Sequence, residues 1–289
     1  MINKVIWKGG VGVLISALHK FIVALFSGFA EFFCVPAFPH LMLYETLTGT
    51  DQTDPMLSLA IHLGALLAGL MACKKRLVYL LRADRQERNT RRRKNRYLDM
   101  NAVMETRMLK TALIPLLISL FFYRRAAAWV NGVAALTLTL LLNGAILFLP
   151  RILARGNKDC RTMSPLDSLV MGLGGVLAMI PGVSRMSGLL TGGLARGTDQ
   201  THVLEYALLL SVPVLFVLVG FDIYAVITAK VAITFLWMMI WLIAGGIAFG
   251  SAYLAILFMR FLAMRSGFYS ICYYSWGMAL FSFVLYLLI

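Results

Sequence analysis

The sequence predicts an all-α polytopic membrane protein with six transmembrane helices and two re-entrant half-helix pairs in an inverted-topology repeat. Of its 289 residues, 60% are hydrophobic and only 14% are charged, and the mean hydropathy is +0.82. These values exclude an ordinary soluble domain. Two apolar stretches are also interrupted by proline or glycine beside an ionisable residue. We therefore expect a single membrane domain, 1–289, with a first half at 1–149 and a second half at 150–289.

Six apolar stretches approach the ~20 residues that a helix needs to cross the hydrocarbon core of a bilayer. Each of these stretches is predicted to cross the membrane once. The predicted spans are 56–73, 107–123, 126–149, 202–228, 232–258 and 266–289.

Two further apolar segments are interrupted near their middles by residues that break helices. Each is predicted to form two half-helices that enter and leave on one side, because irregular backbone at membrane depth must be buried in protein. One alternative stays open: residues 11–34 form a seventh ordinary span with a proline-rich exit, and the second break is a kinked helix. The segments are 11–47, broken at Pro36 and Pro39, and 166–196, broken at Pro181 and Gly182.

The distribution of basic residues predicts the orientation of these segments. The loop 74–96 carries eleven Lys and Arg residues against two acids, so the positive-inside rule makes it cytoplasmic. The basic loop 150–165 falls on the same side if 166–196 is re-entrant. The first broken segment then opens to the outer face and the second to the cytoplasmic face, as in inverted-repeat transporters. Topology thus explains the net charge of +14, and nucleic acid is not an expected partner.

Glu31 is the ionisable residue of the first broken segment. A charged side chain at the bilayer midplane costs at least about 2.5–3.5 kcal/mol, so such a residue indicates a buried polar site. Ser27 precedes Glu31 by one helical turn and shares its face, and the turn at Pro36 brings His40 back toward it. We expect the acid, the hydroxyl and the imidazole to converge. The structural alternative is a protonated Glu31 bonded to a backbone carbonyl.

A second polar group follows the second break, where Ser184, Arg185, Ser187 and Gly188 begin a helix. Free backbone N–H groups at a helix N-terminus, two hydroxyls and a guanidinium together suit a phosphate. Glycines are equally expected where membrane helices pack closely, so spacing alone leaves both interpretations open. The guanidinium of Arg185 favours phosphate binding.

A few other polar residues lie within the apolar stretches. His62, on the span after the first broken segment, either lines the site or is a buried imidazole with a structural partner. For Glu205 and Asp222, near opposite ends of one span, headgroup contact or helix capping is the default interpretation, and Asn143 is a further polar residue of this kind. The sequence has no Walker loop, dinucleotide fingerprint, HExxH zinc motif or nucleophile elbow.

Three stretches of the chain resemble the undecaprenyl-diphosphate phosphatases, the bacitracin-resistance type of membrane phosphatase. Residues 28–40, GFAEFFCVPAFPH, are similar to the family's E-G-x-T-E-F-L-P-V-S-S-T-G-H, with the same length between acid and histidine. Residues 181–189, PGVSRMSGL, resemble its P-G-x-S-R-S-G-A-T. Residues 205–213, followed by Asp222 and Tyr224, look like the family's next span. The resemblance implies six spans and two re-entrant segments.

The resemblance also implies a reaction: hydrolysis of undecaprenyl (polyprenyl) diphosphate to the monophosphate, which recycles the lipid carrier of cell-wall synthesis at the bacterial cytoplasmic membrane. Arg185 would bind the diphosphate, Glu31 would position a divalent cation, Mg²⁺ or Ca²⁺, or orient the catalytic group, and His40 would be nucleophile or general acid/base. The other implied or expected substrate-binding residues are Ser27, Ser184, Ser187, Gly188 and His62.

The chain departs from the family pattern at several positions. Ser27 stands where the family has a glutamate, and Ala37-Phe38-Pro39 replaces a Ser-Thr-Gly that supplies hydroxyls; in the second motif, Met186 and Ser187 replace a serine and a glycine. The loss of these groups motivates an alternative function, a non-catalytic binder or translocase of the polyprenyl phosphate carrier. Both functions take the polyprenyl lipid and membrane lipids as partners, and a homodimer is left open.

Overall fold

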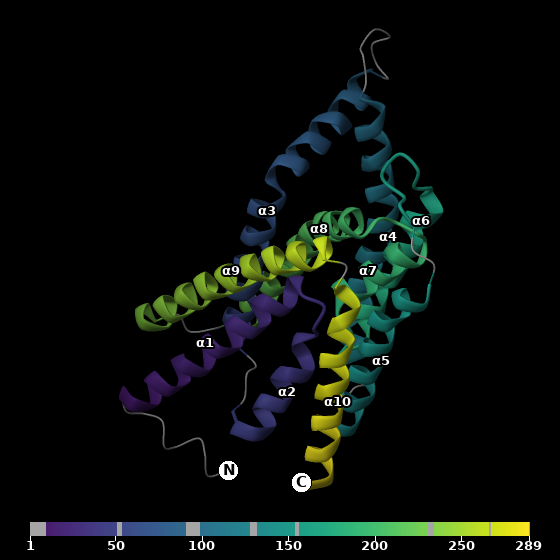
Figure 1. The fold of residues 1–289 in the computed structure, drawn as a ribbon. Coiled ribbons are helices and arrows are strands. Elements are labelled where there is room, and N and C mark those ends of the chain that lie inside the picture. Colours follow the sequence, from purple (N-terminus) through teal and green to yellow (C-terminus); the bar gives the residue numbers. More distant parts are fainter. Residues whose placement is uncertain are drawn as a thin grey trace.

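A computed structural model describes residues 10–50, 54–90, 99–127, 132–153, 156–230, 234–265 and 267–288. Within these ranges every regular element is a helix, as predicted (Figure 1). The α-helices are α1 (Gly10–Phe32), α2 (Ala37–Thr48), α3 (Pro55–Thr90), α4 (Met100–Ala127), α5 (Val133–Ile152), α6 (Pro165–Val176), α7 (Arg185–Ala195), α8 (Gln200–Ala229), α9 (Phe235–Met264) and α10 (Ile271–Leu288), and two short 3₁₀ helices are η1 (Leu177–Met179) and η2 (Phe268–Ser270).

Six helices in the described part of the chain are long and apolar enough to cross a membrane. The protein is therefore a multi-pass membrane protein, and five of the six correspond to predicted spans. The sixth is α1. We predicted it as half of a re-entrant pair, and its length also fits the alternative in which residues 11–34 form an ordinary span. The predicted span 107–123 lies within α4, which is not one of the six. The six are Gly12–Phe32, Pro55–Arg88, Val133–Ile152, Gln200–Ala229, Phe235–Met264 and Phe268–Leu288.

The boundaries of the predicted elements need two corrections. The span 126–149 begins too early: residues 126 and 127 end α4, Gly132 precedes α5 with a φ of +84° that is far from helical, and 128–131 lie outside the described residues. The basic segment 74–96, predicted as a loop, is a continuation of α3 as far as Thr90, and 91–96 lie outside the described residues.

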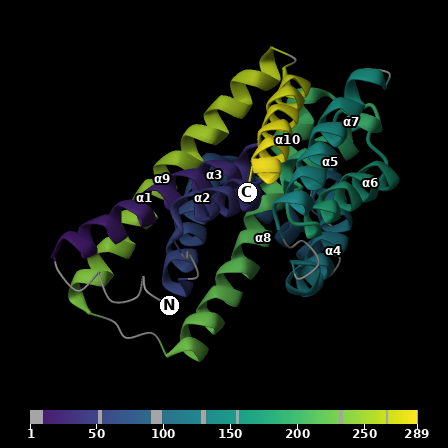
Figure 2. The ribbon, with the colours of Figure 1, turned by 90° about the horizontal axis from the view of Figure 1, so that it is seen from below.

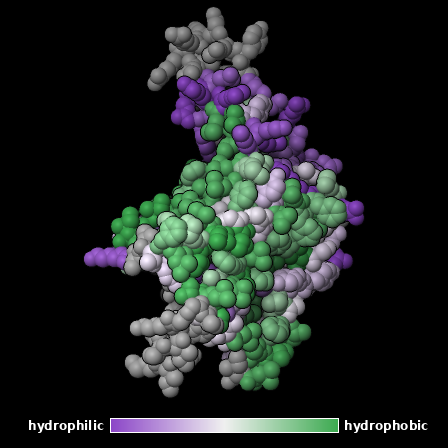
Figure 3. Space-filling model, turned by 90° about the vertical axis from the view of Figure 1, so that its left-hand side faces the viewer, coloured by the Kyte–Doolittle hydropathy of each residue, from purple (hydrophilic) through white to green (hydrophobic). Residues whose placement is uncertain are grey.

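Ion pairs with α4 support the basic end of α3. Arg76 donates to Glu105 of α4 at 2.9 and 2.7 Å, and Arg107 of α4 donates to Glu87 at 2.5 Å. Surface ion pairs of this kind contribute up to about 1 kcal/mol each, so several of them support a helix without fixing it alone. Hydrophilic residues gather at this end of the molecule, whereas much of the face below it is hydrophobic (Figure 3).

Close helix packing organises the apolar body. Helices α1 and α9 lie along one side of the molecule, and α4, α5, α6 and α7 lie on the other (Figure 2). A Cβ on Gly28 of α1 would come within 2.6 Å of the Ala248 carbonyl oxygen of α9, and one on Gly64 of α3 within 2.3 Å of the Gly245 carbonyl oxygen. Small residues let membrane helices approach this closely.

The second broken segment consists of two separate short helices. The apolar helix Pro165–Met179, which joins α6 and η1, ends before residues 180–184, and α7 then runs for 11 residues. At 1.5 Å per residue α7 is about 17 Å long, roughly half of a ~30 Å hydrocarbon core. The alternative of one kinked helix is therefore wrong for this segment.

Candidate functional site

Arg185 and Glu31 form an ion pair where the two broken segments meet. Glu31 lies in the last turn of α1 and Arg185 is the first residue of α7. The Arg185 Nη2 donates to Glu31 Oε1 at 2.5 Å, and the side chains are only 13% and 18% exposed. The structure thus joins the acid of the first motif to the base of the second, as predicted for a shared site.

Two cavities meet at this ion pair. One, of about 170 Å³, is lined by Glu31, His62 and Arg185 together with apolar residues of α4, α8 and η1. The other, of about 140 Å³, lies between the two breaks. Glu31, Ala178 and Arg185 line both cavities. The Arg185 Nε is buried and has no hydrogen-bond partner among the described residues. The guanidinium therefore keeps a donor for a ligand in a largely buried site.

His62 enters the larger cavity from α3 and has a carboxylate partner. Its Nδ1 lies 2.5 Å from Oδ2 of Asp222 on α8, and the two side chains are 25% and 16% exposed. His62 thus lies in the predicted site. Asp222 does not cap a helix but contacts the site through His62, which corrects our default interpretation of this residue.

Ser184 and Ser187 donate to backbone carbonyls left free at the end of α1. Ser184 Oγ donates to the Phe33 oxygen at 3.0 Å, and Ser187 Oγ donates to the Cys34 oxygen at 3.0 Å. Carbonyls at a helix end inside a membrane need such partners. In this conformation the two hydroxyls, which we predicted as phosphate ligands, hold the two breaks together.

Asn143 of α5 completes this junction. Its amide nitrogen donates to the Cys34 oxygen at 3.2 Å, and its amide oxygen accepts the backbone N–H of Ser184 at 3.0 Å. The side chain is fully buried. The sequence identified Asn143 only as a polar residue in an apolar run, because nothing local shows that it lies between the two motifs.

Gly188 serves helix packing. A Cβ at this position would lie 2.0 Å from the carbonyl oxygen of Gly174 on α6, so α6 and α7 are in backbone contact here. Gly182, in the break, has a φ of +101°, and a Cβ there would lie 2.0 Å from Thr139 Oγ1. Both glycines are therefore required by close approach, and Gly182 also by its backbone conformation.

The hydrogen-bond partners of His40 are Pro36 and Tyr274. Its Nδ1 is 2.8 Å from the Pro36 oxygen, its Nε2 is 3.0 Å from the Tyr274 hydroxyl, and its ring is stacked on that of Tyr274. Neither His40 nor Ser27 is among the described residues that line the two cavities. Their convergence on Glu31 stays a prediction, and Tyr274 of α10 is a partner that no sequence signal indicated.

Comparison with known proteins places this arrangement in a family. The family model of the bacitracin resistance protein BacA matches residues 20–281, which include both breaks and every residue described above for the site. The chain belongs to the BacA family. An undecaprenyl-diphosphatase of Neisseria gonorrhoeae is 26% identical to it over 211 residues, covering 71% of this chain and 73% of the relative.

Other relatives of this BacA-family chain match more of its length. An undecaprenyl-diphosphatase of Alkaliphilus metalliredigens is 24% identical and covers 88% of this chain and 93% of the relative. One of Carboxydothermus hydrogenoformans is 23% identical and covers 90% and 94%. The low identity to these relatives agrees with the departures from the family pattern at residues 27–40 and 181–189.

The side chains of the BacA-family site do not by themselves form a cage for a divalent cation. Mg²⁺ is usually held by one or two carboxylates together with waters and substrate phosphates, and Glu31, the residue predicted to position the cation, already accepts from Arg185. No cluster of three or more His, Cys, Asp or Glu side chains within the described ranges could hold a metal ion. No step of the mechanism proposed below therefore passes through a metal.

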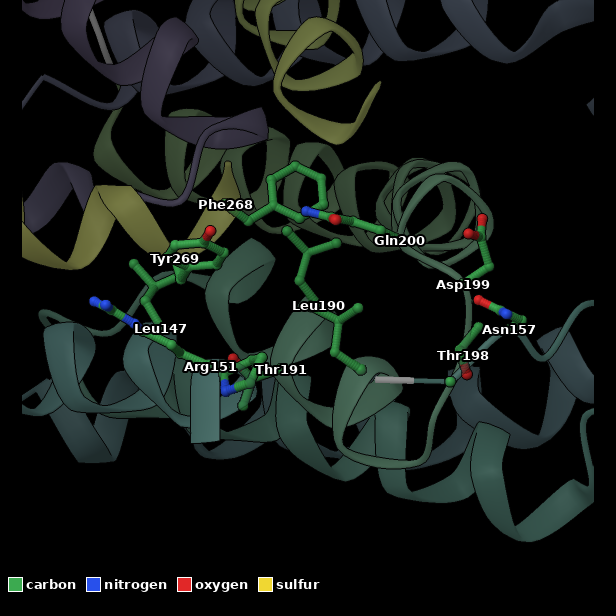
Figure 4. A pocket seen from close by; sticks show the side chains of 13 residues that line it. Leu147, Arg151, Asn157, Leu190, Thr191, Thr198, Asp199, Gln200, Phe268 and Tyr269 are labelled. Atoms are coloured by element: carbon green, nitrogen blue, oxygen red, sulfur yellow. The ribbon is translucent and has the colours of Figure 1, made fainter. Parts of the chain in front are cut away.

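A third cavity, of about 220 Å³, lies between α5, α7, α8 and η2. Arg151 and Tyr269 lie at one end of it and Thr198 and Asp199 at the other, with Leu190 between them (Figure 4). Because its positive group and its polar groups are separated by leucine, this cavity offers no concentrated positive charge. It is a poorer match to a diphosphate than the cavities at Arg185.

Proposed function

We propose that this protein hydrolyses undecaprenyl diphosphate, or a similar polyprenyl diphosphate, to the monophosphate and inorganic phosphate at the bacterial cytoplasmic membrane. The observation that carries the proposal is Arg185, whose buried guanidinium has an unused Nε donor beside a cavity at the start of α7. Family membership adds the substrate class, because the curated relatives carry the name undecaprenyl-diphosphatase.

The site supplies the charge that phosphoryl transfer needs. Negative charge in this reaction is spread over the oxygens of the transferred phosphoryl group, and an arginine and a helix N-terminus both stabilise it. A guanidinium binds two phosphate oxygens in parallel, so the substrate competes with Glu31 for Arg185. Glu31 therefore holds Arg185 in position when the site contains no lipid.

The alternative, a non-catalytic binder or translocase, is less well supported. It rests on the absence of a carboxylate at Ser27 and of a hydroxyl at Ala37. Ser27 is not among the residues that line the two cavities at Arg185, and Ala37 lines only the smaller one. The larger cavity has another ionisable group, His62. The role of His40 as nucleophile or general acid/base stays a prediction, as does the homodimer.

A phosphatase assay tests the proposal. Purified protein in detergent or lipid vesicles is given undecaprenyl or farnesyl diphosphate, and released phosphate is measured with EDTA, with Mg²⁺ and with Ca²⁺. We expect release by the natural sequence and its loss in Arg185→Ala. Release no greater than that of Arg185→Ala under all three conditions would overturn hydrolysis, and lipid transfer between vesicle leaflets would then test the translocase.

The same samples test whether a cation is bound by the protein. If the protein alone binds no cation, calorimetric titration of the lipid-free protein with Mg²⁺ or Ca²⁺ shows no saturable binding in the micromolar range. Saturable binding that disappears in Glu31→Gln would instead support the cation site that the resemblance implies.

We also propose that both broken segments are re-entrant and form an inverted repeat. Support comes from α7 and α2, with 11 and 12 residues, which are too short to cross, and from the hydrogen bonds between the two breaks. Single cysteines at Ser164, before α6, at Gln200, the start of α8, and at Thr48, the end of α2, test it with a thiol reagent that cannot cross the membrane. A re-entrant segment places Ser164 and Gln200 on one face, and the inverted repeat places Thr48 on the other. Labelling of Ser164 and Gln200 from opposite faces contradicts re-entry, and labelling of all three from one face contradicts the inverted repeat.

A further inference from the structure

The larger cavity at Arg185 contains one imidazole, and that imidazole has a fixed orientation. His62 lines this cavity together with Glu31 and Arg185, and its one hydrogen bond in the described part of the chain joins Nδ1 to Asp222. A carboxylate that accepts from Nδ1 fixes the proton on that nitrogen. In the neutral imidazole, Nε2 is then left with a free lone pair.

Hydrolysis needs a general base, and the groups expected from the sequence do not supply one. Attack of water on phosphorus is faster when a base removes the proton of the water, and such a base contributes about 10²–10⁴-fold. His40 has both ring nitrogens within hydrogen-bond distance of Pro36 and Tyr274, and Ala37 provides no hydroxyl. Glu31 already accepts from Arg185.

We infer that His62 is the general base of this site and that Asp222 is its positioning residue, an inference that rests on the proposed hydrolysis. In the step, His62 Nε2 takes a proton from water as the oxygen of that water bonds to the terminal phosphorus. The bond from that phosphorus to the bridging oxygen breaks, and its electron pair leaves with the polyprenyl monophosphate. His62 then gives the proton to the phosphate products or to water.

The carboxylate partner also explains why an imidazole is stable here. An unpaired ionisable side chain at membrane depth is costly, and pairing with a second buried group offsets the cost. Asp222 stabilises the imidazolium that forms when His62 takes the proton, in the way that a buried aspartate supports the histidine of a hydrolase triad. His62 lies outside the three stretches that resemble the phosphatase family, so the resemblance does not contain this assignment.

Kinetics of His62→Gln and Asp222→Asn test the inference. Glutamine keeps a polar side chain of similar reach but cannot act as a base, so we expect kcat to fall about 10²–10⁴-fold with KM nearly unchanged. Asp222→Asn keeps the shape and loses the charge, and its kcat should fall at least about tenfold but less than that of His62→Gln. His202→Gln is the matched control, because His202 is a half-buried imidazole on α8 outside the two cavities at Arg185, and its kcat should stay within about twofold.

Chemical rescue separates a base from a structural residue. Added imidazole should restore phosphate release to His62→Ala in a saturable manner and should not restore Arg185→Ala. Melting temperatures of all variants in the same detergent show whether a loss of activity follows from unfolding.

The outcomes distinguish the two proposals. An active natural sequence with full activity in His62→Gln overturns the assignment of the base and leaves hydrolysis standing. A folded His62→Ala that is inactive and not rescued by imidazole also overturns the base. An inactive natural sequence overturns hydrolysis and the base together.

Discussion

The guanidinium of Arg185 and the carboxylate of Glu31, 154 residues apart in sequence, are joined by a hydrogen bond of 2.5 Å between two helix ends. Each residue carries the charge that its own helix disfavours: Glu31 lies beside the negative end of α1, and Arg185 beside the positive end of α7. The two unfavourable charges are compensated by each other. Such local conflict with helix electrostatics is expected at functional sites rather than at structural ones.

Removal of one member of this pair should therefore destabilise the fold more than removal of both. Glu31→Gln and Arg185→Met each leave a buried charge unpaired, and each should lower the free energy of unfolding by up to about 3–5 kcal/mol. The double variant should be more stable than the sum of the two losses predicts. Thermal or denaturant unfolding in detergent measures the coupling, and additive losses would show that the pair does not interact in solution.

Ser187 should contribute to stability and little to the reaction, because its hydroxyl donates to the Cys34 carbonyl and is fully buried. In Ser187→Ala that carbonyl keeps the bond from the Asn143 amide and loses one of its two partners, and we expect a loss of about 0.5–1.5 kcal/mol. At a temperature where the variant is folded, kcat/KM should change less than threefold, on the order of half a kcal/mol. A raised KM with unchanged stability would instead make Ser187 a phosphate ligand, the role that we predicted for it.

Gly188 and Gly220 form a matched pair of helical glycines. A methyl group on Gly188 meets the Gly174 backbone, whereas one on Gly220 meets nothing within 4 Å. Gly188→Ala should cost about 1–3 kcal/mol or more through overpacking, and Gly220→Ala should raise stability by up to about 1 kcal/mol through helix propensity. Melting temperatures of the two variants check this. Equal effects would contradict the close contact of α6 and α7.

Protonation of the Asp54 carboxylate should destabilise the fold in acid. Burial alone would raise the pKa of Asp54, but hydrogen bonds from Lys20 and from Trp241 Nε1 outweigh it and hold the pKa below its usual value. A lowered carboxyl pKa stabilises the fold above the unfolded value of about 4 and loses this contribution as the pH falls through the folded value. Unfolding from pH 7 to pH 3 should show this loss in the natural sequence and a smaller one in Asp54→Asn.

The sequence predicted the helical class, most of the spans and the positions of both breaks. Proline and glycine interrupt a helix through their own backbone chemistry, so Pro36 and Gly182 could be interpreted without knowledge of their neighbours. It did not predict that the basic segment continues α3, because the ion pairs that support this end involve acids such as Glu105, which α4 brings beside it.

Charge alone identified the two residues that meet between the breaks. Glu31 and Arg185 are costly in a membrane without a partner, which made them visible from sequence, and His62 was included for its position on the next span. The roles of Ser187 and Gly188 could not be decided in the same way. A hydroxyl and a glycine serve a phosphate and a helix contact equally well, and only the neighbours, Cys34 and Gly174, decide between them.

The sequence by itself determined that this chain spans a membrane and that one acid and one base interrupt its apolar segments, because composition and helix-breaking residues act locally. Only the tertiary structure decided that the two charges meet, that His40 pairs with Tyr274, and that Asp222 orients His62 beside the two charges. Hydrogen bonds and ion pairs act over a few ångströms, so partners separated by 150 residues or more are chosen by how the helices pack.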